Sequence, residues 1–146
     1  MGEAATAAHG ERYRQAAWAY VVYGVVYWLG GLALAQSGLG PRGMERGGTA
    51  WFVVGALFVV VFPWILMAER GWFTRWILSR RDFARILTLL VAIRAVEVAR
   101  IARMPRAETI GVLGLDVPVR AGAWVFCLLT IFTAVLLARA AWSRQP

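Results

Sequence analysis

The segment AGAWVFCLLTIFTAVLLARAAW, residues 121–142, carries no charged side chain until Arg139. A helix of this length extends about 33 Å, and the hydrocarbon core of a bilayer is about 30 Å thick. So long an apolar run is typical of a membrane-spanning helix, whereas apolar strands and buried core helices are usually shorter. We therefore predict that residues 121–142 cross a membrane.

Three further segments have the length and apolar composition of membrane spans, and hydrophobic residues make up 60% of the 146-residue chain. Soluble domains are only about 45–50% apolar, and a soluble chain of this size could not bury the excess. The first run resembles a signal peptide but exceeds the usual length of its apolar region, so we interpret it as a membrane helix. The predicted fold class is all-α: one domain, residues 1–146, forming a polytopic four-helix transmembrane bundle. The predicted spans are residues 16–35, 49–68, 82–104 and 121–142.

The segments between these spans also have distinctive compositions. From residue 69 to 81, the apolar positions 72, 73, 76 and 77 share one helical face between arginines, which predicts a short helix in the lipid headgroup region. The side chains expected to contact headgroups there are Arg70, Trp72, Arg75, Trp76, Arg80 and Arg81. Residues 106–120 are predicted to form a rather apolar loop. Within the second span, Pro63 lacks a backbone donor and is expected to kink the helix.

All sixteen basic residues are arginines, and their distribution predicts the topology. Nine lie near span ends on one side, and five lie on the other. The nine are Arg12, Arg14, Arg70, Arg75, Arg80, Arg81, Arg85, Arg139 and Arg144, and the five are Arg42, Arg46, Arg103, Arg106 and Arg120. The positive-inside rule then places both termini in the cytoplasm, as expected in a bacterial-type inner or plasma membrane. The net charge of +8 favours anionic lipid headgroups over nucleic acid as partner, because the arginines lie between apolar spans.

Small side chains recur at three- or four-residue spacing on the third and fourth predicted spans. In lipid, helices associate by close packing of such residues. The third span has Ala84, Thr88, Ala92, Ala95, Ala99 and Ala102, and the fourth has Ala123, Cys127, Thr130, Ala134 and Ala138. We predict that these two rows face each other, with Cys127 as a small packing residue in preference to a reactive thiol. On the first span, Tyr13, Tyr20 and Tyr27 recur every seven residues and predict an aromatic packing stripe.

The third span carries charges at three-residue spacing: Arg94, Glu97, Arg100 and Arg103. A charge near the bilayer centre costs about 2.5 to 3.5 kcal/mol by insertion scales, so this cluster requires partners. Three interpretations remain open: an ion network that fixes helix register, a site for an anion, a proton or a lipid phosphate, and a docking surface for a partner subunit. The spacing resembles the fourth helix of voltage sensors. Glu97 interrupts it, however, and the other spans lack acidic partners, so no voltage sensing is implied.

The residue inventory restricts the chemistry. With one cysteine, one histidine and no lysine, the chain has no intrachain disulfide, no thiolate zinc site, no bis-histidine haem and no Schiff base. We predict no catalytic residue, no metal and no cofactor, while an apolar pigment or quinone between helices stays open. The leading hypothesis is a non-enzymatic accessory, assembly or scaffold subunit that packs as a homo-oligomer or with partner membrane subunits. The alternative is a small anion or proton transporter or channel using Arg94, Glu97 and Arg100. An enzyme acting on a lipid phosphate, with Glu97 or Asp116 as acid–base group, is a weaker hypothesis.

Overall fold

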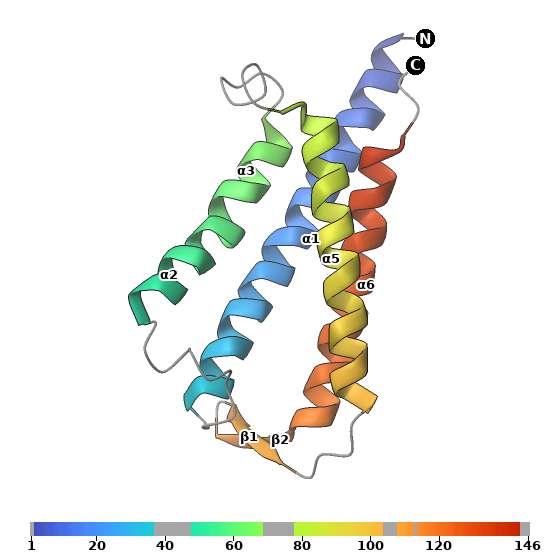
Figure 1. Ribbon diagram of the computed structural model, residues 1–146. Helices are drawn as coiled ribbons and strands as arrows, with labels where there is room; N and C mark the ends of the chain where they lie inside the picture. Colours follow the sequence, from blue (N-terminus) through green and yellow to red (C-terminus); the bar gives the residue numbers. More distant parts are fainter. Residues whose placement is uncertain (1, 37–47, 69–77, 104–107, 113, 144–146) are drawn as a thin grey trace.

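The computed structural model describes residues 2–36, 48–68, 78–103, 108–112 and 114–143. Helices account for most of them (Figure 1). The helical segments are α1 (Gly2–Gln36), α2 (Gly48–Ala56), the π-helical segment η2 (Leu57–Val61), α3 (Phe62–Met67), α5 (Arg80–Arg103) and α6 (Val119–Ala141). The strands are β1 (Thr109–Val112) and β2 (Leu115–Pro118). The prediction of a mainly helical chain is confirmed.

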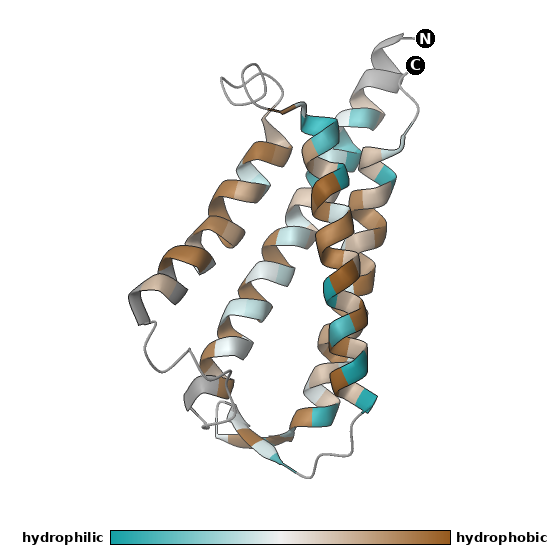
Figure 2. Ribbon diagram, viewed as in Figure 1, coloured by the Kyte–Doolittle hydropathy of each residue, from teal (hydrophilic) through white to brown (hydrophobic). Residues whose placement is uncertain are grey.

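Two of the described helices, α1 and α6, are long and apolar enough to cross a membrane. The α2–η2–α3 rod contains a shorter apolar helix over Val53–Met67. Helix α5 has the length of a span but is interrupted by charges, and Figure 2 shows hydrophilic residues at both of its ends. The number of spans is therefore taken up below as part of the proposed function.

Each predicted span corresponds to a helix with shifted ends. Helix α1 begins fourteen residues before the predicted residue 16, whereas α5 and α6 each begin two residues before the predicted start. The second span is continuous from Gly48 to Met67, but it changes geometry before Pro63. There the N–H of Phe62 donates to the carbonyl of Leu57, a π-type bond. Because Pro63 has no N–H and its ring crowds the carbonyl four residues earlier, a wider turn at this point accommodates it.

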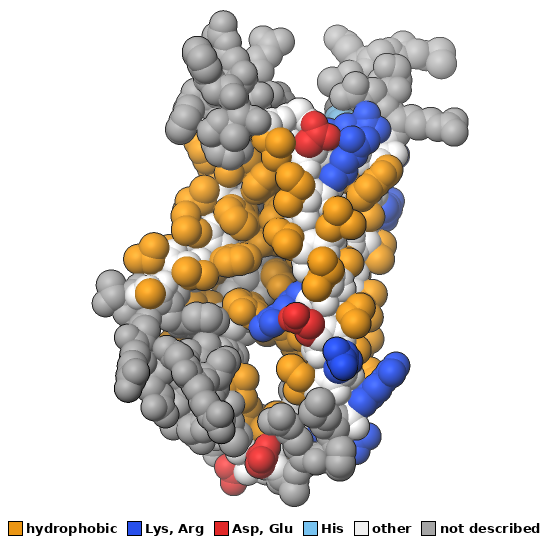
Figure 3. Space-filling view, viewed as in Figure 1, with side chains coloured by type: hydrophobic (Ala, Val, Ile, Leu, Met, Phe, Trp, Pro, Cys, Tyr) orange, Lys and Arg blue, Asp and Glu red, His pale blue; other side chains and the backbone are white. Residues whose placement is uncertain are grey.

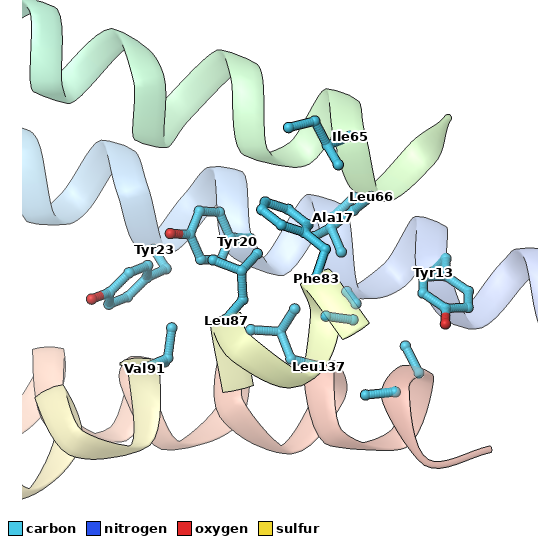
Figure 4. Close-up of a cluster of buried hydrophobic side chains, with 14 residues drawn as sticks. Tyr13, Ala17, Tyr20, Tyr23, Ile65, Leu66, Phe83, Leu87, Val91 and Leu137 are labelled. Atoms are coloured by element: carbon cyan, nitrogen blue, oxygen red, sulfur yellow. The ribbon is translucent and has the colours of Figure 1, made fainter. Parts of the chain in front are cut away.

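Helix α1 lies at the centre of the bundle, against both α6 and α3, while α5 packs mainly on α6 (Figure 1). The core between them is aromatic on the α1 side and, apart from Phe83 of α5, aliphatic on the α5 and α6 side (Figure 4). Tyr20 and Tyr23 of α1 are buried, with their rings 5.6 Å apart, and Tyr20 also meets Phe62 of α3 at 6.1 Å. Leu87 of α5 and Leu137 of α6 complete this core.

The prediction that residues 106–120 form a loop requires correction, because a β-hairpin lies within them. Strands β1 and β2 pair antiparallel, from Thr109 opposite Pro118 to Val112 opposite Leu115. Gly114, in the turn, has φ of 80°, a left-handed conformation that glycine adopts without steric cost. β-Branched residues on both strands favour extended backbone. The hairpin lies at the end of the bundle opposite the two termini (Figure 1).

The two ends of the chain meet at the other end of the bundle. The hydroxyl of Ser143 lies 3.1 Å from Nδ1 of His9, which joins the residues after α6 to the first turns of α1. The first turns of α1 and the end of α6 therefore lie at the same end of the bundle.

Candidate functional site

The predicted charge cluster forms a hydrogen-bonded group between α5 and α1. Nη1 of Arg94 donates to Oε2 of Glu97 at 2.7 Å, and Nη2 of Arg94 donates to the hydroxyl of Tyr27 at 3.3 Å. The guanidinium carbon of Arg94 lies 5.1 Å from the centre of the Tyr27 ring, within the range of a cation–π contact. Arg94 therefore links the middle of α5 to the tyrosine stripe of α1.

An aromatic wall holds Arg94 in this position. The ring of Tyr27 stacks on Tyr23 at 6.2 Å and on Phe126 of α6 at 6.0 Å, and it meets Phe58 of η2 at 6.3 Å. Contacts from three helices fix the tyrosine, so its hydroxyl is a rigid acceptor for the arginine. One donor remains: Nε of Arg94 is buried and has no hydrogen-bond partner among the described residues.

Glu97 lies on the opposite side of Arg94, in an exposed apolar face of α5. Its side chain is 52% exposed. Along the helix it lies between Ile93 and Ile101, which are four residues before and four residues after it and are also exposed. We call this surface the α5 face. It consists of Ile86, Leu90, Ile93, Glu97 and Ile101. Figure 3 shows an acidic side chain beside a basic one at mid-height of the bundle, with hydrophobic side chains above them. A carboxylate thus interrupts an otherwise apolar surface.

Arg100 and Arg103 continue the charged row toward the hairpin end and are both exposed. Among the described residues, no ion pair to either guanidinium is formed. Within the predicted charge cluster, the structure thus forms an ion pair between Arg94 and Glu97, and Arg100 is a cation about one turn beyond it.

The rows of small residues lie where α5 and α6 meet, with one exception. Ala95, Cys127 and Thr130 are buried, and the thiol of Cys127 points at the carbonyl of Ala95 at 3.8 Å. Ala99, Ala123 and Ala134 are partly buried. Ala92 is exposed, and Val91 and Val98 are the buried neighbours in its place. The 100° advance per residue puts Ala92 beyond the edge of the contact, which the three-or-four spacing alone did not resolve.

Of the residues predicted to contact headgroups, Arg70, Trp72, Arg75 and Trp76 lie outside the described residues. Arg80 and Arg81 belong to the first turn of α5 and make contacts within the protein. The guanidinium of Arg80 lies 3.8 Å from the centre of the Tyr13 ring, and Nε of Arg81 donates to the carbonyl of Ala141 at 2.9 Å. They join α5 to both α1 and α6 at the end where the termini meet.

His9 belongs to the same end of the bundle, before the apolar part of α1. Partial burial lowers the pKa of His9 below its ordinary value of 6.5, and the neighbouring charges of Arg80, Arg12 and Arg81 lower it further. Sequence reasoning did not assign this arginine-rich end any internal contact. The seven-residue recurrence of Tyr13, Tyr20 and Tyr27 could have indicated such a contact, because it placed the Tyr13 ring on the packing stripe at this end of α1.

The two acid–base candidates predicted from the sequence, Glu97 and Asp116, lie on different elements of the fold. Within the described residues, no group of three histidine, cysteine or acidic side chains could hold a metal ion. Asp116, the second acid–base candidate, lies on β2 opposite Gly111, in the hairpin and not on α5. The sequence prediction named Glu97 but missed the apolar residues around it, although their spacing of four, three, four and four residues identifies one helical face. Comparisons with protein-family models, curated proteins and solved structures find no match to this chain.

Proposed function

We propose that this chain is a four-helix membrane protein without chemistry of its own, and that it serves as an assembly or scaffold subunit through the α5 face. The membrane part of the proposal is supported by exposure. Only 28% of the apolar window of α1 and 22% of that of α6 are buried, whereas a core helix of a soluble protein is mostly buried. Side chains such as Val60 and Val125 are more than 60% exposed. Such extensive apolar surface requires lipid or protein around it.

The other two spans follow from packing against these helices. Helix α5 has 24 residues, and Ala84, Ala95 and Ala102, which are spread along it, are buried. Because α5 packs chiefly on α6, it accompanies α6 over most of its length. Such a helix is about 36 Å long. The α2–η2–α3 rod packs along α1, where a Cβ on Gly24 would lie 3.2 Å from Val59. Trp18, Trp64 and Trp142 are exposed on three different elements, as in the aromatic belt of a membrane interface.

The assembly role is inferred from the position of Glu97. If α5 spans the bilayer, this half-exposed carboxylate lies near mid-depth with Arg94 as its partner and apolar side chains around it. Polar groups in hydrocarbon favour helix association, because a second helix supplies the missing contacts. The α5 face offers such a helix both apolar area and a charge.

A second copy of the chain is the partner that this surface fits best. Arg100 lies three residues from Glu97, about 4.5 Å along the helix axis. In a two-fold symmetric contact, Glu97 of each copy would meet Arg100 of the other, because an isologous interface repeats every contact. One surface thereby supplies both the acid and the base. Ile93 and Leu90 would pack across the same interface.

The test uses the full chain in lipid nanodiscs, with native mass spectrometry as readout. We expect dimers, which are lost in Ile93→Trp but kept in Leu128→Trp, a matched control on the exposed side of α6. Arg100→Glu should weaken the dimer about tenfold or more, because it would replace the expected ion pair between copies with two facing carboxylates. A wild-type monomer with no bound chain, or a dimer indifferent to both Ile93→Trp and Arg100→Glu, would refute the proposal.

A second candidate, an anion or proton pathway, rests on Nε of Arg94, which is buried and has no hydrogen-bond partner among the described residues. A Glu near the midplane can carry a proton, and arginine-lined pores favour anions. Flux of protons and chloride into liposomes distinguishes the two roles. Proton flux that disappears in Glu97→Gln supports a pathway, while equal leak in both proteins removes Glu97 from any transport mechanism.

A further inference from the structure

A groove of about 440 Å³ runs between α1 and α6, on residues that the α5 face does not include. Its walls come from nine residues that change in character along its length. They are Glu11, Arg14, Gln15, Trp18, Ala19 and Val22 of α1 and Leu129, Phe132 and Leu136 of α6. The volume falls within the roughly 300–1,000 Å³ of small-ligand sites.

The polar end of the groove carries one acid and one base side by side. Nη2 of Arg14 lies 2.5 Å from Oε2 of Glu11, and Nε2 of Gln15 donates to Oε1 of Glu11 at 3.3 Å. The side chains of Arg14 and Glu11 are 65% and 42% exposed, so both charges are available to a ligand. A purely anionic headgroup would match Arg14 but be repelled by Glu11. A zwitterionic headgroup matches both.

The rest of the groove has the length and order of a lipid in one leaflet. From Glu11 to Val22 the helix rises about 16 Å, close to half of the 30 Å hydrocarbon thickness. Trp18, which is 62% exposed, follows the charged turn at the depth where aromatic rings mark the interface. The lining residues beyond it are all apolar: Ala19, Val22, Leu129, Phe132 and Leu136.

We infer that this groove binds one phospholipid with a phosphoethanolamine headgroup. The phosphate contacts Arg14, the primary ammonium contacts Glu11, and one acyl chain lies along α1 and α6 past Trp18. The ammonium is preferred over a choline headgroup, because it carries N–H donors for the carboxylate and a quaternary ammonium carries none. The inference concerns a face separate from the assembly surface and goes beyond the role proposed for it.

The test measures lipid retention by the full chain. The protein is delipidated in mild detergent and offered palmitoyl-oleoyl phosphatidylethanolamine, phosphatidylcholine or phosphatidylglycerol in turn, and native mass spectrometry counts bound lipid. We expect one phosphatidylethanolamine per chain, held about tenfold more tightly than phosphatidylglycerol. Arg14→Gln should weaken it about tenfold, and Glu11→Gln should remove the preference over the other two lipids. Arg12→Gln, next to the groove but not lining it, is the matched control and should change nothing.

A steric variant tests the apolar end without touching the core. Val22 is 49% exposed and lines the groove, so Val22→Trp should fill it and abolish lipid retention while the melting temperature stays unchanged. Equal binding of all three lipids would overturn the inference, because retention would then not depend on the headgroup. Equal loss in Arg12→Gln and Arg14→Gln would also overturn it, because general electrostatic attraction would then explain retention. A change of oligomeric state in Val22→Trp with lipid still bound would also overturn it and would assign the groove to a protein helix.

Discussion

Two ion pairs on α5 have almost the same geometry but different expected depths, and comparing them tests the membrane assignment. Arg85 and Asp82 are 3.0 Å apart, with side chains 38% and 49% exposed. Arg94 and Glu97 are 2.7 Å apart, with side chains 40% and 52% exposed. Both pairs have i,i+3 spacing on one helix. The first lies at the end of α5 near the termini, and the second lies at its middle.

The expected energies follow from the surroundings of the charge that is left behind. Arg85→Met frees a carboxylate at the aqueous end, where an exposed pair is worth at most about 1 kcal/mol. Arg94→Met leaves the Glu97 carboxylate in hydrocarbon, so the free energy of unfolding should fall by about 2.5 to 3.5 kcal/mol. Combining Arg94→Met with Glu97→Leu removes both charges and should return stability to within about 1 kcal/mol of the parent, or exceed it.

Unfolding in bicelles, followed by tryptophan fluorescence against denaturant, measures all three variants. A dilute sample, in which the chain is monomeric, keeps association out of the comparison. If Arg94→Met and Arg85→Met lower stability by the same amount, below about 1 kcal/mol, then both pairs are in water. The middle of α5 would then lie outside the bilayer, and the argument from Glu97 would fail with it.

Three further predictions concern packing and pH. Gly55→Ala should destabilise the fold by about 1–3 kcal/mol, because the added Cβ would overlap the indole of Trp28. Gly122→Ala, where a Cβ would point into open space, should stabilise the fold by about 0.4–1 kcal/mol. Thermal melts measure both changes. Because the pKa of His9 is lowered in the folded state, the unfolded chain takes up the proton first, and stability should fall as pH drops below about 6.5. Melts at pH 5 to 8 should show this slope in the parent and a flat profile in His9→Gln. Cys127 is 2% exposed and should react with a maleimide only after unfolding, so rapid labelling of the folded protein would contradict its place between α5 and α6.

Hydropathy located the long helices among the described residues, since a run of about twenty apolar residues is typical of a helix. It could not locate the start of α1, because the residues before Ala16 are polar. Their alanines nevertheless favour helix, and Glu11 and Arg14 at i,i+3 support it. The hairpin was not predicted, although Ile110 and Val112, and Leu115 and Val117, alternate with small or polar residues as paired strands do. Gly114 between two β-branched segments was the signal for a turn.

The candidate site was predicted only in part, for a geometric reason. Sequence spacing shows that Arg94 can reach Glu97, since three residues on a helix always lie close. It does not show which side of α5 stays uncovered. That depends on α5 packing chiefly on α6, and on the α2–η2–α3 rod packing chiefly on α1. Tyr27 becomes the partner of Arg94 only because α1 lies between α6 and the α2–η2–α3 rod.

The division of α5 into two surfaces explains why a charged helix can persist in this bundle. Its small residues hold it to α6, where Thr130 and Ala102 are fully buried, so the stability of the monomer does not depend on the α5 face. A leucine in place of Glu97 would suit lipid better and would remove the need for Arg94 to leave water. The pair therefore lowers the stability of an isolated chain, and association is the step in which that loss can be recovered. The free energy of association should therefore become less favourable when Glu97 and Arg94 are both made aliphatic. If it is unchanged, the ion pair does not contribute to association, and the pathway role is left as its explanation.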